Sequence, residues 1–308
     1  MKKTIRILGV IFIAQLIIVT ALLLPTEDSV GSINKQNLLT FSPNQVNKII
    51  ISGGDKALIL ESENTEWNLP EYYGFPVAKN RVPEFIQKLS DFKQGWPVAT
   101  TKAAAKRFKV SDDDFERKIE LYQGESLLDT LYVGSSPGFR KVHVRKANTN
   151  NIYDVSFSAF DASIKTADWR DSSLLRLEQT AIIKISSPDF SLIKEGDLFV
   201  LDGVDESLPI VQSTVARYVQ KVIALNTVTV LGTETRIAFN QADPLLLLTV
   251  ESKTEKWEYR LSRSSEGEYV LKRSDLPFYF VLHDEVAKPL IVNDKKHFLL
   301  QPESESDT

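Results

Sequence analysis

Hydrophobic residues follow three patterns along this chain, and each pattern predicts a different kind of element. The first is an uninterrupted run without charge from Ile7 to Leu24, which as a helix would be about 27 Å long, close to the thickness of a bilayer core. Farther along, alternation of apolar and polar residues predicts strands, and apolar stripes with a period near 3.6 predict helices.

The apolar run predicts an uncleaved single-pass anchor in an inner membrane. Three cations lie in residues 1–6, and the first charges after the run, Glu27 and Asp28, are acidic. This charge bias keeps the N-terminus in the cytoplasm and places the bulk of the chain in the periplasm. A cleaved signal peptide, with cleavage near residues 19–21, and a buried helix of a soluble protein are the alternatives. The run is longer than the usual apolar core of a signal peptide, which is roughly 7–15 residues.

The globular part is predicted to contain one unit twice. Residues 48–61 read as two strands around Gly53-Gly54, and residues 181–203 read as two strands around Ser187-Pro188-Asp189. Alternating residues, Ile49 with Ile51 and Ile183 with Ile185, predict one buried face for each first strand.

An amphipathic helix follows in both halves, and its apolar stripe recurs at a constant offset of 133 positions. The paired positions are Val82 with Val215, Phe85 with Tyr218, Ile86 with Val219, Leu89 with Val222, and Phe92 with Leu225. Chance agreement between two common amphipathic patterns is the alternative to duplication.

Four more strands are predicted in each half, at 118–122, 127–133, 141–145 and 151–155, and then at 245–251, 257–262, 268–272 and 278–282. The first half carries an extra segment, Thr101–Glu116, with a short helix and a second helix start at Ser111. Ser158–Leu177 is expected to be helical, with Phe160, Ile164 and Ala167 on one side.

The predicted fold class is α+β, with two tandem related units after the anchor. Each unit would be a curved, mostly antiparallel sheet with a covering helix. The expected divisions are 1–6 cytoplasmic tip, 7–24 anchor, 25–46 juxtamembrane spacer, 47–177 first repeat, 178–292 second repeat and 293–308 C-terminal tail.

Short motifs make the chain resemble the bacterial family known only as "domain of unknown function" 4340. They are W-x-L at Trp67, L-x-V-G at 131–134, V-x-V-R at 142–145, I-Y-x-V at 152–155 and W-R-D at 169–171. The resemblance covers nearly all of the chain after the anchor. It implies an accessory subunit of an ATP-binding-cassette transporter of the gliding-motility type, and it implies no catalytic residues.

No catalytic, cofactor or metal site is predicted. The letters G-x-S-x-G occur at 134–138, but Pro137 lacks the N–H that the oxyanion hole of a nucleophile elbow needs after Ser136. The three histidines do not stand at ligand spacing, 112–114 lacks the glycine and glutamate of a calcium loop, and no phosphate-binding loop is present. The chain has no cysteine, which excludes lipid attachment at a lipobox cysteine, disulfides and thiol catalysis.

Seven residues are candidates for contact with a partner or ligand: Gln15, Trp67, Trp96, Trp169, Arg170, Asp171 and Trp257. Gln15 would hydrogen-bond to another transmembrane helix or simply face lipid. The W-R-D motif would be either a packed helix end or a partner-binding corner. The tryptophans would stack on a ligand if two or more line one pocket, and would support scaffolding if buried in separate cores.

The predicted function is therefore a non-enzymatic, membrane-anchored periplasmic scaffold or accessory subunit whose partner is a transporter permease. The alternative is a binding module for a glycan, peptide or lipid in the cleft between the two repeats, and a hydrolase is a third hypothesis. A net charge of −4 without a basic stripe makes nucleic acid an unexpected partner.

Overall fold

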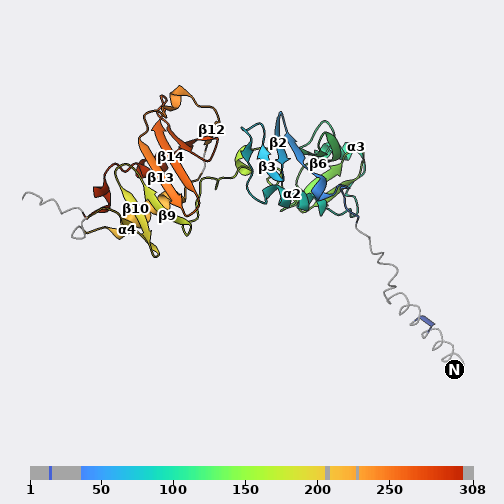
Figure 1. Cartoon of the computed structure of the whole chain (residues 1–308). Coiled ribbons are helices and arrows are strands. Elements are labelled where there is room, and N and C mark those ends of the chain that lie inside the picture. The colour runs from blue at the N-terminus through green and yellow to red at the C-terminus, as the bar shows by residue number, and fades with distance from the viewer. Residues whose placement is uncertain (1–13, 16–35, 205–208, 227–228, 301–308) are drawn as a thin grey trace, which may run out of the picture. The chain divides into compact units, whose positions relative to one another are not determined.

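The protein is built from two eight-stranded sheets (Figure 1). The computed structural model describes residues 14–15, 36–204, 209–226 and 229–300. The first sheet contains β1 (Lys48–Gly53), β2 (Lys56–Glu63), β3 (Glu66–Leu69), β4 (Phe75–Pro76), β5 (Arg117–Gln123), β6 (Ser126–Val133), β7 (Val142–Lys146) and β8 (Ile152–Val155). The second contains β9 (Ile182–Ser186), β10 (Ser191–Glu195), β11 (Leu198–Leu201), β12 (Thr229–Gly232), β13 (Leu246–Ser252), β14 (Lys256–Arg263), β15 (Tyr269–Arg273) and β16 (Tyr279–Leu282).

Seven successive strands take the same order in the two sheets. The first sheet runs β4-β3-β2-β1-β5-β6-β7-β8, and the second runs β11-β10-β9-β13-β14-β15-β16-β12. The sheets differ in their extra edge strand, β4 beyond β3 in the first and β12 beyond β16 in the second. The described fold is therefore sheet-rich and mostly antiparallel, as expected from the short turns between strands.

Few helices accompany the sheets. The α-helices are α2 (Arg81–Ser90), α3 (Lys102–Arg107), α4 (Gln212–Ile223) and α5 (Asp284–Ala287), and 3₁₀ turns lie at Pro43–Gln45, Thr166–Asp168, Ile237–Phe239, Lys288–Leu290 and Lys295–Phe298. Every residue of the two predicted apolar stripes, including Val82 and Val215, is buried. In the second sheet, the α4 stripe shares one core with residues of β9, β10, β11 and β13–β16.

By contacts, the chain divides into two compact units. Unit 1 comprises Met1–Val46 and Ile86–Ala162, and unit 2 comprises Asn47–Phe85 and Ser163–Thr308. Each unit is described by itself below.

The predicted anchor lies outside the described residues except for Ala14 and Gln15, which are helical and exposed. Within the part of the chain that the structure describes, no helix is both long and apolar enough to cross a membrane. The tail from 301 to 308 also lies outside the described residues.

Three sequence predictions of local structure are wrong. Ser158–Leu177 contains only the 3₁₀ turn Thr166–Asp168, and Phe160 is exposed rather than packed. The Ser111 hydroxyl does accept from the Asp114 N–H (3.0 Å), as a helix cap would, but no helix follows, because the chain turns back: the Ser111 N–H donates to the Asp114 carbonyl and Val110 bridges to Phe115. Ile182, not Ile183, faces the core, because the register with β13 shifts between Glu251 and Ser252 and turns the strand.

Gly134 is the glycine whose replacement is expected to disturb this fold. A Cβ on Gly134 would overlap the backbone oxygens of Phe108 and Lys109 and lie 2.7 Å from Val110 Cγ1. We expect Gly134→Ala to lower the free energy of unfolding by about 1–3 kcal/mol, because the colliding atoms are mostly backbone and cannot turn away. Urea unfolding of the full chain followed by circular dichroism measures the change.

Gly138 supplies the matched control for that substitution. A Cβ there meets nothing within 4 Å, so Gly138→Ala is expected to change stability by less than about 0.5 kcal/mol. Equal midpoints for the two variants would contradict the close approach at Gly134.

Candidate functional site

One cavity is lined by two of the seven predicted contact residues, Trp67 and Asp171, and we call it the Trp67 cavity. Its volume is about 580 Å³. Trp67 on β3 is half-buried, and the 76–83 segment and the start of α2 form the other walls. The lining residues are Thr65, Glu66, Trp67, Pro76, Val77, Ala78, Lys79, Asn80, Val82, Pro83, Asp171 and Leu174. An indole and two prolines beside the charged groups of Glu66, Lys79 and Asp171 suit a polar ligand with an apolar face.

The W-R-D motif forms the support behind this cavity. The Trp169 side chain is fully buried, its Nε1–H donates to the Ser163 carbonyl (2.8 Å), and its ring meets Phe85 edge-on at 5.2 Å. The Arg81 guanidinium lies 4.9 Å from the centroid of the same ring. Trp169 therefore packs inside the protein in this conformation.

Arg170 and Asp171 attach the motif to the segment that precedes α2. Arg170 bridges to Val77, and the Asp171 N–H donates to the Pro76 carbonyl (2.9 Å). The Asp171 carboxylate accepts hydrogen bonds from the N–H and the hydroxyl of Ser173 (2.8 and 2.6 Å). Arg170 Nε is buried and has no hydrogen-bond partner among the described residues.

The structure does not bring the remaining candidates into the Trp67 cavity. Trp257 is buried in the core of the second sheet. Trp96 is 83% exposed in the segment between α2 and α3. Gln15 is exposed, and its neighbours in the sequence, apart from Ala14, are outside the described residues. One of the four predicted tryptophans therefore lines this cavity, one is packed behind it and two are elsewhere.

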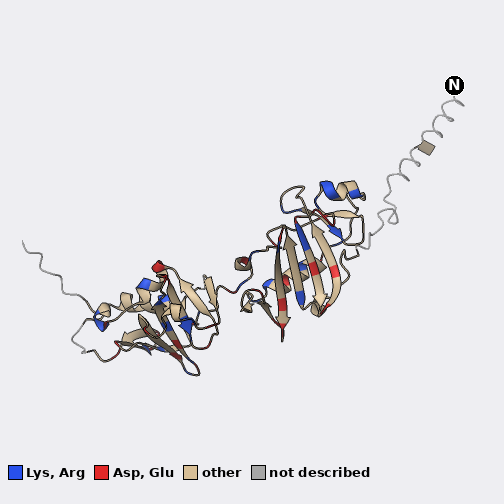
Figure 2. Ribbon diagram, turned by 90° about the horizontal axis from the view of Figure 1, so that it is seen from above, with Lys and Arg blue, Asp and Glu red and all other residues tan. Residues whose placement is uncertain are grey.

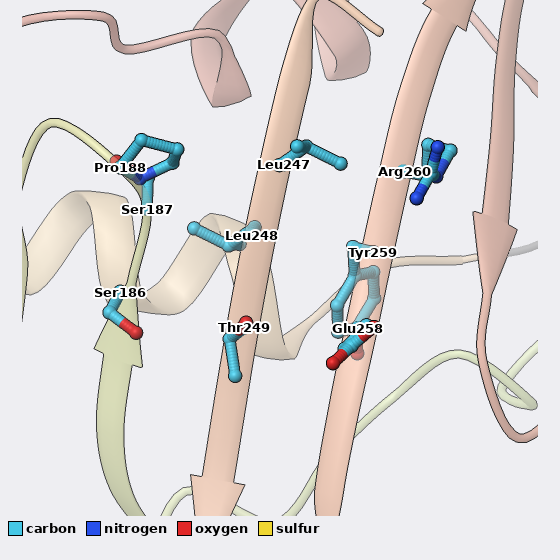
Figure 3. A pocket seen from close by; sticks show the side chains of 9 residues that line it. All are labelled: Ser186, Ser187, Pro188, Leu247, Leu248, Thr249, Glu258, Tyr259 and Arg260. Carbon is cyan, nitrogen blue, oxygen red and sulfur yellow. The ribbon is translucent and has the colours of Figure 1, made fainter. Parts of the chain in front are cut away.

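A second cavity of about 350 Å³ lies on the second sheet, over β9, β13 and β14 (Figure 3). Figure 3 shows Thr249 and Glu258 together, as their pairing across β13 and β14 requires, with Ser186 at the end of β9. Burial raises the pKa of Tyr259, which has no hydrogen-bond partner for its hydroxyl among the described residues. The cavity is shallow and pairs no nucleophile with a base.

A serine, a histidine and an aspartate that the sequence analysis did not connect come together at the edge of unit 1. His143 Nδ1 lies 2.8 Å from the Ser135 carbonyl oxygen and 3.2 Å from Ser135 Oγ, and its Nε2 lies 3.5 Å from Asp154. The short contact with a carbonyl requires a proton on Nδ1, so this nitrogen cannot accept the proton of the Ser135 hydroxyl. The arrangement ties strands together and does not activate a nucleophile.

Ser136, the serine of the G-x-S-x-G letters, is also part of a turn. Its hydroxyl lies 2.7 Å from the carbonyl oxygens of both Gly138 and Lys141 and can donate to one of them at a time. Among the described residues no cluster of three or more His, Asp or Glu side chains could hold a metal ion. Figure 2 shows cationic and anionic residues interspersed over both sheets.

Two buried arginines occupy matching positions in the sheets. Arg145 on β7 pairs with Tyr132, and its guanidinium lies 4.6 Å from the centroid of that ring. Arg273 on β15 pairs with Tyr259 and lies 5.8 Å from that ring. The hydrogen bond from Arg145 lowers the pKa of Asp112. The signal in the sequence was an arginine at or next to the end of the second-to-last strand of each half.

Residues 36–40, which we call the juxtamembrane strap, are bound firmly to unit 1. Leu38 and Leu39 are buried, and the Leu38 N–H donates to the Phe92 carbonyl (2.7 Å). The Thr40 N–H donates to the buried carboxylate of Asp129 (2.9 Å), which also pairs with Lys146 (2.9 Å). The described residues 36–40 are thus packed against unit 1.

Comparison with known families gives one result. A family model described as "Domain of unknown function (DUF4340)" matches residues 67–245, more than half of the chain. No curated protein and no solved structure matches significantly.

Proposed function

From the premise that the chain belongs to the family of the domain of unknown function DUF4340, we propose that it is a membrane-anchored periplasmic accessory subunit. Its partner would be the permease of an ATP-binding-cassette transporter of the gliding-motility type, and its role would be non-enzymatic. Residues 7–24 would hold it in the inner membrane with residues 1–6 in the cytoplasm.

The juxtamembrane strap is the observation that carries this proposal. A strap bound through Leu38, Leu39 and Thr40 leaves only residues 25–35 between the folded part and the apolar run. Confinement of this kind raises the effective concentration of a protein toward partners in the same membrane. A scaffold benefits from such an attachment, since its contact surface then stays within reach of the membrane.

We also propose that the two predicted repeats, 47–177 and 178–292, arose by duplication. The shared order of seven strands supports it, as do the equivalent cross-strand pairs Tyr132–Arg145 and Tyr259–Arg273. Two related repeats would present two similar surfaces, and a protein that bridges two partners needs such a pair.

Chemical crosslinking in native membranes followed by purification of the full chain tests the partner. We expect a transporter permease among the crosslinked proteins, and recovery of no permease would overturn the proposal.

Asp129→Ala removes the acceptor for Thr40 and Lys146 and is expected to weaken crosslinking by loosening the strap. Glu125→Ala, on the exposed turn between β5 and β6, is the control and should leave crosslinking unchanged.

The Trp67 cavity supports a second candidate function, the binding of a glycan or peptide. The lining residues 65–67, 76–80, 82–83, Asp171 and Leu174 all lie inside the first predicted repeat, whereas the sequence analysis expected the ligand in a cleft between the repeats. Titration of the full chain with soluble cell-wall glycan fragments and proline-containing peptides, read by tryptophan fluorescence, tests it. A saturable change lost in Trp67→Ala would favour a binding module.

A further inference from the structure

Two turns of unit 1 expose phenylalanine side chains to solvent. Phe139 is 87% exposed and Phe160 is 88% exposed. We call the turns that carry them, residues 138–141 and 158–161, the aromatic turns. A single exposed apolar side chain is ordinary, but neighbouring ones can mark an interaction surface.

Hydrogen bonds fix both aromatic turns in shape. Ser136 Oγ reaches the carbonyls of Gly138 and Lys141, and Arg140 takes a left-handed backbone conformation (φ 53°) that residues with a side chain rarely adopt. In the other turn, Asp161 accepts from the Ser158 N–H (2.8 Å). Both phenylalanines are therefore presented outward by a rigid frame.

The aromatic turns border one cavity. Arg140 from the first turn and Ser158 and Asp161 from the second line a space of about 460 Å³, together with Lys88, Ser156 and Phe157. The two exposed rings thus belong to neighbouring turns, although neither ring lines the cavity itself.

The surface of the aromatic turns is cationic as well as aromatic. Arg140 and Lys141 directly follow Phe139 and are exposed, and the Arg140 guanidinium lies 5.0 Å from the Phe139 ring. The acid in these turns, Asp161, is already paired with Lys88 at 2.9 Å. Aromatic rings beside uncompensated cations are the combination that prefers the interface of a membrane with anionic lipids.

The juxtamembrane strap connects this surface with the N-terminal part of the chain that carries the predicted anchor. The strap bonds to the Phe92 carbonyl, and the Phe92 ring packs edge-on against Phe157 (5.4 Å) in the wall of the cavity. Residues 25–35 separate the apolar run from the strap and can span at most about 40 Å.

We propose that Phe139 and Phe160 insert into the headgroup layer of an anionic membrane, with Arg140 and Lys141 on lipid phosphates, so that unit 1 rests on the bilayer. This inference depends on the anchoring in the proposed function. It adds a second, peripheral contact that would orient the protein toward its partner in the membrane.

The absence of cysteine makes the test direct. Full chains with Phe139→Cys or Phe160→Cys are labelled with an environment-sensitive fluorophore and reconstituted into vesicles that contain phosphatidylglycerol. We expect a blue shift of the emission and strong quenching by lipids that carry a spin label. Charge reversal by Arg140→Glu with Lys141→Glu should reduce both effects.

Leu127→Cys is the matched control, because Leu127 is 53% exposed in the same unit but lies at the opposite end of β6 from the first aromatic turn. Its label should remain in water. Water-like emission at both aromatic turns overturns the inference, and a shift seen only in native membranes overturns it in favour of a protein partner. Flotation of the same vesicles distinguishes the anchor from the peripheral contact. If the chain floats with the vesicles but its labels remain in water, the anchor holds and the peripheral contact is wrong. If the chain does not float, the anchor itself is contradicted.

Discussion

Replacing Trp169 with alanine is expected to lower the free energy of unfolding by about 3–5 kcal/mol. The side chain is fully buried, and its removal leaves a space beside Phe85 and Arg81. The Ser163 carbonyl would also lose the hydrogen bond from the indole N–H. Urea unfolding of the full chain, followed by far-ultraviolet circular dichroism, measures the change.

Trp96→Ala is the control for Trp169→Ala. The same side chain is deleted, but Trp96 is 83% exposed, so the free energy of unfolding should change by no more than about 0.5 kcal/mol. If the two substitutions cost the same, the W-R-D motif is not a packed support. A loss of transporter crosslinking in Trp96→Ala without a loss of stability would instead identify Trp96 as a contact residue.

The second large effect is expected at Arg273. Its guanidinium donates to the carbonyls of Leu174 and Leu175 (3.1 and 3.0 Å) and to the carboxylate of Asp275 (2.6 Å). Arg273→Met keeps most of the volume but leaves the carbonyls of Leu174 and Leu175 without their donor, whereas the exposed Asp275 carboxylate can be solvated. Since a buried acceptor left unsatisfied costs about 1–3 kcal/mol, we expect a total loss of about 2–5 kcal/mol. Thermal unfolding monitored by circular dichroism checks this value.

Two further variants separate the charge of Arg273 from its geometry. Arg273→Lys retains the charge but not the planar fork, so it is expected to recover only part of the stability. Lys256→Met on the adjacent strand removes an exposed cation that lies 3.7 Å from the exposed Glu258, and should cost less than about 1 kcal/mol. A similar cost for Lys256→Met and Arg273→Met would show that the buried guanidinium is not structurally important.

Elements with a strong local period were predicted well. The stripes of α2 and α4 repeat every three or four residues, and every member is buried. The eight predicted strands after these helices correspond to β5–β8 and β13–β16 within one or two residues. A period of two or of 3.6 survives in the sequence because one face of each element must be apolar.

Predictions failed where an apolar residue had more than one possible environment. Phe160 was placed on the buried side of a helix, but it lies at the tip of a turn shaped by Ser158 and Asp161. Trp169 and Trp96 were equivalent candidates, although one is fully buried and the other is 83% exposed. Composition cannot distinguish these cases, because burial depends on which distant segment covers the residue.

The candidate site was predicted in part. Trp67 and Asp171 do line one cavity, and the sequence offered both as contact residues without indicating that they are neighbours. The strap contacts of Asp129 with Thr40 and Lys146 were missed, because they join positions far apart in the chain that carry no common motif.

The sequence by itself determined the apolar run at 7–24, the strand and helix periods, the recurrence of one pattern after about 130 positions and the absence of thiol chemistry. Only the tertiary structure decided which aromatic residues are buried, which of the seryl and histidyl groups meet, and that the aromatic turns share a cavity. The reason is physical: a local pattern follows from the geometry of one element, whereas exposure and pairing depend on strand register and on segments that the fold brings together.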